Sequence, residues 1–259
     1  FKIIAPFHCI LSRSETPVTR ELIDKAPKLK VIARAAVGIG NIDVNYATEK
    51  GILVINTPGK NTNSAAELTI GLLLSAMRKM IPAHIHMSEL KWDRHTFTGT
   101  ELLGKTIGII GLGNVGHLVA RYAKAFDMEV LAYDPYVADE VFERHNSIKC
   151  TWDELISSAD VISLHVPKNT ETTGMIGAKE FSRMKSGVVI LNTARGGIIQ
   201  EKPLLEELKS GRVAAAGIDT WEEEPPQENP FRDLPQVVMS PHVGASTTEA
   251  QIRIAKSIA

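Results

Sequence analysis

Residues 106–116, Thr-Ile-Gly-Ile-Ile-Gly-Leu-Gly-Asn-Val-Gly, constrain the fold of this chain more than any other segment. The apolar start of this run predicts a short strand, and its last three glycines predict a tight turn into a helix that packs close to the strand. Amide groups at the start of such a helix attract phosphate, and the missing side chain of Gly113 lets a pyrophosphate approach the backbone. The run therefore predicts a dinucleotide site.

A second strand, predicted over residues 128–133, ends at Asp134, 18 residues after Gly116. A carboxylate at this place can accept both hydroxyl groups of the adenosine ribose and repels a 2′-phosphate. A glycine pattern alone often marks a turn without a ligand. Because strand, helix, second strand and acid follow in register here, the sequence favours NAD over NADP.

Strand-like apolar runs alternate with helical stretches over the rest of this region and predict one doubly wound parallel sheet. The predicted strands cover residues 107–110, 130–132, 161–164, 188–191, 214–218 and 237–239.

Residues 1–58 predict a smaller parallel sheet. Its strands are expected over residues 1–5, 9–11, 31–33 and 53–55, with helices over 19–25 and 44–50. Ser64-Ala-Ala-Glu67 has the pattern of a capping box and predicts the start of a long helix that leads from one domain to the next.

The composition argues against several kinds of partner. The 259 residues include 29 basic and 30 acidic ones, so the formal net charge is −1 and no basic tail favours nucleic acid or an anionic membrane. Cys9 and Cys150 lie far apart, and no apolar run reaches the ~18 residues of a membrane-spanning helix. A cytoplasmic protein with reduced thiols is expected.

The chain begins at Phe1 rather than Met, and both of its ends are expected to be truncated.

Polar side chains follow three of the predicted strands at the ends where a ligand would lie. Arg195 follows the fourth strand, Asp219 and Glu224 follow the fifth, and His242 follows the sixth. Taken singly, each is more often a surface ion pair, a solvated acid or a turn residue. Their common place beyond a dinucleotide fold favours a catalytic site, because catalytic groups gather in such crevices.

Taken in order, these segments resemble the NAD-dependent D-2-hydroxyacid dehydrogenases over nearly the whole chain. The resemblance is carried by residues 111–116, 133–135, 165–167, 192–197, 217–225 and 240–244. It implies an α/β protein with two doubly wound parallel-sheet domains, in which a Rossmann-type NAD domain is inserted in a smaller flavodoxin-like substrate domain. The expected limits are 1–58 and 247–259 for the substrate domain and 59–246 for the NAD domain.

The resemblance also implies that His242 is the acid/base, Glu224 its partner and Arg195 the substrate anchor. The chemistry agrees with these roles. When a hydride leaves an alcohol carbon, the hydroxyl proton must leave too, and imidazole titrates in a suitable range. The planar guanidinium of Arg195 can bind a carboxylate or a keto oxygen through parallel hydrogen bonds.

Further residues are implied in binding. The cofactor set is Gly111, Gly113, Asn114, Val115, Gly116, Tyr133, Asp134, Pro135, His165, Val166, Pro167, Thr193, Ala194, Asp219 and Gly244, with Asp219 holding the nicotinamide amide. The substrate set is Arg34, Val37, Gly38, Asn41 and Arg13, with backbone amides of Val37 and Gly38 facing the substrate carboxylate. Ala36 and Gly40 depart from the usual family pattern in this loop, where the family has Gly and Asp, and this leaves the substrate open.

Oxidation of 3-phosphoglycerate to 3-phosphohydroxypyruvate, with NAD as cofactor, is the first expectation. Reduction of glyoxylate or hydroxypyruvate and D-lactate-type chemistry are alternatives within the class. An NAD-sensing scaffold like the carboxyl-terminal-binding corepressors is the alternative outside it.

Residues 81–103 show no clean period and contain Trp92 and Phe97, so they predict an arm or interface rather than core. The family forms dimers through such an arm, so a homodimer or a dimer-based oligomer is expected. His84 and His86 are two apart and would lie on different faces of a helix, so no metal is expected.

Overall fold

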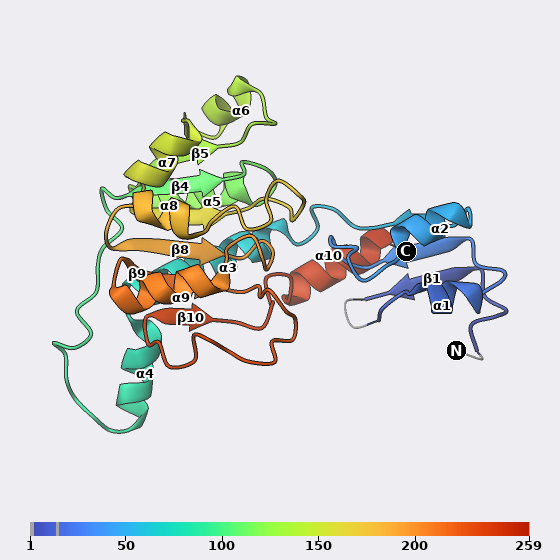
Figure 1. The fold of residues 1–259 in the computed structure, drawn as a ribbon, viewed down its shortest axis with the longest axis horizontal. Helices are drawn as coiled ribbons and strands as arrows, with labels where there is room; N and C mark the ends of the chain where they lie inside the picture. The colour runs from blue at the N-terminus through green and yellow to red at the C-terminus, as the bar shows by residue number, and fades with distance from the viewer. Residues whose placement is uncertain (1–2, 14–15, 259) are drawn as a thin grey trace. The chain divides into compact units, whose positions relative to one another are not determined.

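The computed structural model describes residues 3–13 and 16–258, which form two compact units (Figure 1). One unit comprises the chain up to Thr62 and from Ala245 onward, and the other comprises Asn63–Gly244. The limits predicted for the inserted domain were 59 and 246.

The larger unit contains a sheet of seven parallel strands among the described residues. They are β4 (Thr106–Ile110), β5 (Glu129–Tyr133), β6 (Ile148–Lys149), β7 (Val161–Leu164), β8 (Val188–Asn192), β9 (Val213–Ile218) and β10 (Val237–Met239). Their spatial order is β10-β9-β8-β7-β4-β5-β6, so the chain reverses direction across the sheet between β4 and β7. The predicted α/β class and the doubly wound sheet are confirmed, and the crevice beyond the ends of β4 and β7 is where such a sheet binds ligands.

Alternate residues of these strands feed two separate cores, one on each face of the sheet. Ile107 and Ile109 of β4 belong to one core, whereas Ile110 belongs to the other. The first core is covered by α3 (Thr62–Met77), α5 (Gly116–Ala125) and α6 (Asp139–Arg144). The second is covered by α7 (Trp152–Ser158), α8 (Ala178–Arg183) and α9 (Glu201–Ser210), and Figure 1 shows α8 and α9 lying over the strands.

The smaller unit is built on a parallel sheet with the order β1 (Cys9–Ser12), β2 (Val31–Arg34), β3 (Leu53–Ile55). It also contains α1 (Arg20–Asp24), α2 (Val44–Glu49) and α10 (Thr248–Ile258). The Thr19 hydroxyl accepts from the Leu22 amide and caps α1, and Asp43 caps α2 in the same way. Val18, Ile32 and Ala47 are fully buried at the centre of this unit.

Two sequence predictions of secondary structure were wrong in detail, and one strand was not predicted. The strand expected over residues 1–5 is a turn in its described part, where the Phe7 amide donates to the Ile4 carbonyl, and residues 1 and 2 lie outside the described residues. The helix expected to begin at Ser64 begins at Thr62, so Ser64 lies inside α3 and is buried. The two-residue edge strand β6 was not predicted.

The arm predicted over residues 81–103 lies in the larger unit and begins with α4 (Met80–Ser88). No residue of α4 is buried, and in Figure 1 this helix projects away from the sheet. Leu90 and Trp92, which follow it, are 92% and 76% exposed. Among the described residues no helix is both long enough and apolar enough to cross a membrane.

Candidate active site

The three glycines of the 111–116 loop meet different physical requirements. Gly111 has φ +92°, which favours glycine, and a Cβ on Gly116 would lie 2.0 Å from the Gly111 carbonyl oxygen. Both glycines are therefore required by the turn and by the approach of α5 to β4. A Cβ on Gly113 would meet nothing within 4 Å, so no atom of the described residues explains this glycine. The open surface at Gly113 is what a bound pyrophosphate requires.

Asp134, at the end of β5, lies against this glycine loop. Its Oδ2 accepts from the Leu112 amide at 2.9 Å, and its Oδ1 accepts from the Tyr136 amide at 3.0 Å. Together with the open backbone at Gly113, this places a fixed carboxylate beside a phosphate-type loop. The residues present fit NAD, since Asp134 is held where a ribose would follow the pyrophosphate.

The loops after β5 and β7 are joined across the end of β4. Tyr136 follows β5 and donates its hydroxyl hydrogen bond to the Glu171 carboxylate, which follows β7. Neither residue was predicted from the sequence, because their contact joins segments on opposite sides of β4 and no local pattern signals it.

Other predicted cofactor residues line the same edge of the sheet. Val166 and the His165 carbonyl approach Gly111 so closely that a Cβ there would lie 2.9 Å from each of them. His165 Nε2 is 2.8 Å from the Ser163 hydroxyl, and burial lowers the pKa of His165 to about 3. His165 is therefore neutral near pH 7 and is suited to lining the crevice rather than to proton transfer.

Thr193 and Asp219, both predicted to bind the cofactor, make buried contacts with other segments of the larger unit. The Thr193 hydroxyl is 2.7 Å from the Thr69 hydroxyl of α3, and both groups are buried. Asp219 is fully buried, and Oδ1 accepts from the Ser240 hydroxyl at 2.6 Å and from the Val243 amide at 2.8 Å, while Oδ2 accepts from the Gly244 amide at 2.9 Å. Asp219 therefore holds the segment 240–244 in place, and its contact with the nicotinamide amide stays a prediction.

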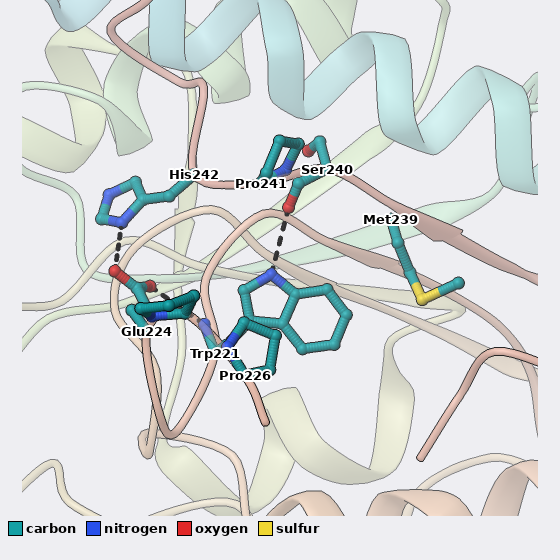
Figure 2. A pocket seen from close by; sticks show the side chains of 8 residues that line it. Trp221, Glu224, Pro226, Met239, Ser240, Pro241 and His242 are labelled. Carbon is teal, nitrogen blue, oxygen red and sulfur yellow. Dashed lines mark hydrogen bonds and ion pairs between the residues drawn. The ribbon is translucent and has the colours of Figure 1, made fainter. Parts of the chain in front are cut away.

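His242 and Glu224 lie next to each other, as the motifs implied. His242 Nδ1 and Glu224 Oε2 are 2.7 Å apart, and the two side chains are 41% and 38% exposed (Figure 2). The Trp221 amide donates to the other oxygen of Glu224 at 3.1 Å, which fixes the carboxylate on its own loop. His242 has φ +52°, a conformation that costs about 1–2 kcal/mol for a residue with a side chain. The bonds from Asp219 to the neighbouring residues hold the segment in this conformation.

The pair also shifts the pKa of each partner. The hydrogen bond to Glu224 raises the pKa of His242 above its ordinary value against the opposing effect of burial, and the charges of Glu224 and Asp219 add to the rise. Burial raises the pKa of Glu224, but hydrogen bonds from His242 and from the Trp221 amide outweigh it and keep that pKa below its ordinary value. The positive charge of Arg195 lowers both pKa values, so its guanidinium lies within electrostatic reach of the pair.

Arg195 is presented by a turn that Asn192 shapes. The Asn192 amide group donates to the Arg195 carbonyl at 2.9 Å, and its oxygen accepts from the Ala194 amide at 3.1 Å. A Cβ on Gly196 would lie 1.5 Å from the Trp221 carbonyl oxygen. The loop of Arg195 therefore packs directly on the loop that carries Glu224.

A cavity of about 410 Å³ opens beside the pair. Its lining residues are Trp221, Glu224, Pro225, Pro226, Met239, Ser240, Pro241 and His242. Figure 2 shows His242 and Glu224 on one side of it and Met239 on the other, with the Trp221 ring between them. The Trp221 indole donates to the Ser240 carbonyl at 3.1 Å and ties the two loops together. Trp221 was not predicted from the sequence, although its place between Asp219 and Glu224 was a usable signal.

The residues predicted to bind substrate in the smaller unit are bonded within that unit. Arg34 Nε donates to the Gly38 carbonyl at 3.0 Å, and the Asn56 amide group donates to the Val37 carbonyl at 2.7 Å. Asn41 donates to the Thr16 carbonyl at 2.8 Å, and Arg13 donates to Gln251 of α10 at 2.8 Å. These bonds fix the loop after β2, and its contact with a substrate stays a prediction.

The comparisons with known proteins agree with this geometry. Residues 70–244 match the D-isomer specific 2-hydroxyacid dehydrogenase NAD binding domain. The chain is 49% identical over 257 residues to a D-3-phosphoglycerate dehydrogenase of Archaeoglobus fulgidus. This match covers 99% of this chain and 49% of that protein. It is 46% identical over 256 residues to a hydroxypyruvate reductase of Thermotoga maritima, and this match covers 98% of this chain and 83% of that protein. The structure of D-lactate dehydrogenase from Aquifex aeolicus with NAD and lactic acid matches with a TM-score of 0.88 at 30% identity. This match covers 98% of this chain and 81% of that chain.

The chain belongs to the D-isomer-specific 2-hydroxyacid dehydrogenase family, and its larger unit contains the NAD-binding domain of that family. The resemblance inferred from the sequence motifs is confirmed, and so is NAD as the cofactor. The chain spans about half the length of the curated D-3-phosphoglycerate dehydrogenases that it matches.

Proposed function

We propose that this protein is an NAD-dependent dehydrogenase that interconverts a D-2-hydroxy acid and the corresponding 2-keto acid. The observation that carries the proposal is the His242–Glu224 hydrogen bond of 2.7 Å in the same unit as the glycine loop. An imidazole held by a carboxylate at the edge of a dinucleotide fold is the proton-transfer group that such a reaction needs.

NAD supplies the hydride acceptor when it is bound. His242 removes the proton of the substrate hydroxyl, using the ring nitrogen that does not face Glu224. The Glu224 carboxylate stabilises the imidazolium that forms and keeps the ring in one orientation. In the reverse direction the protonated His242 returns this proton to the keto oxygen.

Arg195 is proposed as the substrate anchor. Its charge lies near the pair, and its backbone is fixed by Asn192 and Gly196. A guanidinium can bind a carboxylate through two parallel hydrogen bonds and at the same time polarise an adjacent keto oxygen. We propose that Asp134 excludes NADP, that the glycine loop binds the pyrophosphate, and that Arg34, Val37, Gly38, Asn41 and Arg13 serve the substrate.

We propose 3-phosphoglycerate as the substrate, oxidised to 3-phosphohydroxypyruvate. The support is that D-3-phosphoglycerate dehydrogenases are 43–49% identical to nearly the whole chain. Hydroxypyruvate is the second candidate, because the relative from Thermotoga maritima is nearly as similar and is covered over 83% of its length.

A panel of substrates followed by NADH absorbance tests this proposal. We expect 3-phosphoglycerate to be oxidised with a kcat/KM at least about tenfold above D-lactate, and His242→Ala to lower turnover by ~10²-fold or more. Preference for hydroxypyruvate would select the second candidate. Absence of turnover with every acid, despite NAD binding, would reject a dehydrogenase and favour a scaffold.

We also propose that a second copy of the chain covers the arm that begins at α4. Met80, Ile81, Ile85 and Met87 are all about half exposed. A helix with so much apolar surface and no buried residue favours a protein partner.

A further inference from the structure

Two glutamates outside the catalytic pair bind each other's backbone in a reciprocal way. The Glu201 amide donates to Glu222 Oε1 at 2.9 Å, and the Glu222 amide donates to Glu201 Oε1 at 2.8 Å. Glu201 is the first residue of α9, and Glu222 lies 21 residues further on, in the loop that carries Glu224. We call these two residues the Glu201–Glu222 pair.

One of the two bonds has an ordinary structural purpose. The first amides of a helix lack partners inside the helix, and Gln200 at the start of α9 makes no side-chain cap. The Glu222 carboxylate therefore serves as the cap of α9, where the helix dipole also favours a negative charge.

The other bond acts on the catalytic loop. The Glu222 amide belongs to the peptide that joins Trp221 to Glu222, and the carbonyl of the same peptide lies against Gly196. The next bond along the loop is the one from the Trp221 amide to Glu224 Oε1, which orients the carboxylate that binds His242. Glu201 thus fixes a peptide whose neighbouring amide orients Glu224.

The surroundings of Glu201 show that this contact is maintained at a cost. Burial raises the pKa of Glu201 above its ordinary value, and the nearby charge of Glu222 adds to the rise. The charges that shift the pKa of His242 are those of Glu224, Asp219 and Arg195. An effect of Glu201 on His242 must therefore pass through the position of the loop.

We propose that Glu201 is a positioning residue for the catalytic pair: by holding the 221–222 peptide, it keeps Glu224 turned toward His242. The inference rests on the proposed role of His242 as the acid/base. Unlike Arg195 or Glu224, Glu201 needs no contact with substrate or cofactor for this task.

The two bonds can be removed separately, because each joins one side chain to one backbone amide. Glu201→Ala removes the hold on the Glu222 amide but leaves Glu222 free to cap α9. Glu222→Ala removes the cap of α9. The backbone amide at position 222 remains, and it can still donate to the Glu201 carboxylate. Glu206→Ala, an exposed change on the same helix, is the matched control.

The pKa of His242, measured by NMR titration of its ring in the protein without substrate, is the deciding readout. We expect Glu201→Ala to lower this pKa by about half a unit or more, because the carboxylate that raises it is no longer held in place. Glu222→Ala is expected to lower the melting temperature while leaving the His242 pKa within about 0.2 unit of the unchanged protein, as is Glu206→Ala. Glu201→Gln keeps an acceptor oxygen and should restore the pKa.

An unchanged His242 pKa in folded Glu201→Ala, or an equal fall in Glu222→Ala, would overturn the inference and leave only a helix cap. If Glu201→Ala does not fold, Glu201→Asp is used in its place. Its side chain is one methylene shorter and cannot reach the Glu222 amide, so the pKa of His242 is again expected to fall. Failure of the unchanged protein to oxidise any hydroxy acid would reject the proposed function but would not alter these pKa comparisons.

Discussion

At the scale of single residues, the pKa of His242 links the geometry of the site to a measurable pH profile. Oxidation of a hydroxy acid needs His242 neutral, so activity should rise as the pH increases through the pKa of His242. Glu224 raises that pKa through its hydrogen bond and its charge. The rising limb of the profile should therefore lie above the ordinary pKa of histidine.

Replacing Glu224 by Gln tests this link. The carboxylate charge is lost while burial of the ring, which lowers the pKa of His242, remains. The rising limb of kcat/KM for oxidation should therefore move to lower pH, and turnover at the optimum should fall by about tenfold or more. A limb that stays at the same pH in Glu224→Gln would show that the His242–Glu224 bond does not govern the profile.

Asp134 carries the second prediction at this scale. Asp134→Ala removes the carboxylate that is proposed to accept the ribose hydroxyls and to repel a 2′-phosphate. We expect kcat/KM for NAD to fall by about tenfold or more and NADP to gain relative to NAD. Asp139→Ala, an exposed acid in the same region, provides a control. An unchanged ratio of the two efficiencies would remove Asp134 from cofactor selection.

The sequence indicates which residues lie together when their place follows from a strand end. His242, Glu224 and Arg195 could be predicted together because the carboxyl ends of parallel strands meet at one edge. The buried contacts of Asp219 with residues 240–244 could not be predicted, because they join separate loops and depend on backbone amides that carry no sequence signal.

At the scale of elements, strand length decided what could be predicted. The six strands found in advance for the large sheet are apolar runs of three residues or more, whereas β6 has two exposed residues and no such pattern. The start of α3 was misplaced because Ser64 has the composition of a cap but is buried inside the helix. The Thr62 hydroxyl instead bonds the Gly59 carbonyl at 2.9 Å just ahead of it.

The turn from β4 into α5 gives a prediction at this scale. Gly116→Ala would bring a methyl group against the Gly111 carbonyl, so the turn must shift and stability should fall by about 1–3 kcal/mol. Gly113→Ala has room in the protein, so its melting temperature should change by at most a few degrees. Because the added methyl group would occupy the space left for pyrophosphate, NAD should bind about tenfold more weakly or worse.

Thermal unfolding with and without NAD separates the two variants. Gly116→Ala should unfold at lower temperature in both conditions, while Gly113→Ala should lose most of the stabilisation that NAD gives. Wild-type affinity for NAD in Gly113→Ala would show that the open surface there is not a phosphate site.

At the scale of the whole molecule, the inserted domain is predicted over residues 59–246, and the larger compact unit comprises Asn63–Gly244. The domain limits stay a prediction, whose physical basis is that each unit has its own hydrophobic core. The spacing of apolar residues could not predict the helix in the arm, because α4 has no buried face that would impose a helical spacing.

The exposed apolar surface of α4 makes its proposed burial against a second copy testable. If a second copy covers α4, a charge on its apolar surface should disrupt the assembly, because an unpaired carboxylate would be buried in the interface. We expect the unchanged protein to sediment as a dimer or a multiple of it at micromolar concentration, and Ile85→Glu to shift it towards the monomer. Ile148→Glu is the control, because Ile148 is similarly exposed, at 48% against 51% for Ile85, but lies on the edge strand β6. Sedimentation velocity decides between the outcomes. A monomeric unchanged protein would refute the assembly, and a dimer that survives Ile85→Glu would place the contact elsewhere than on α4.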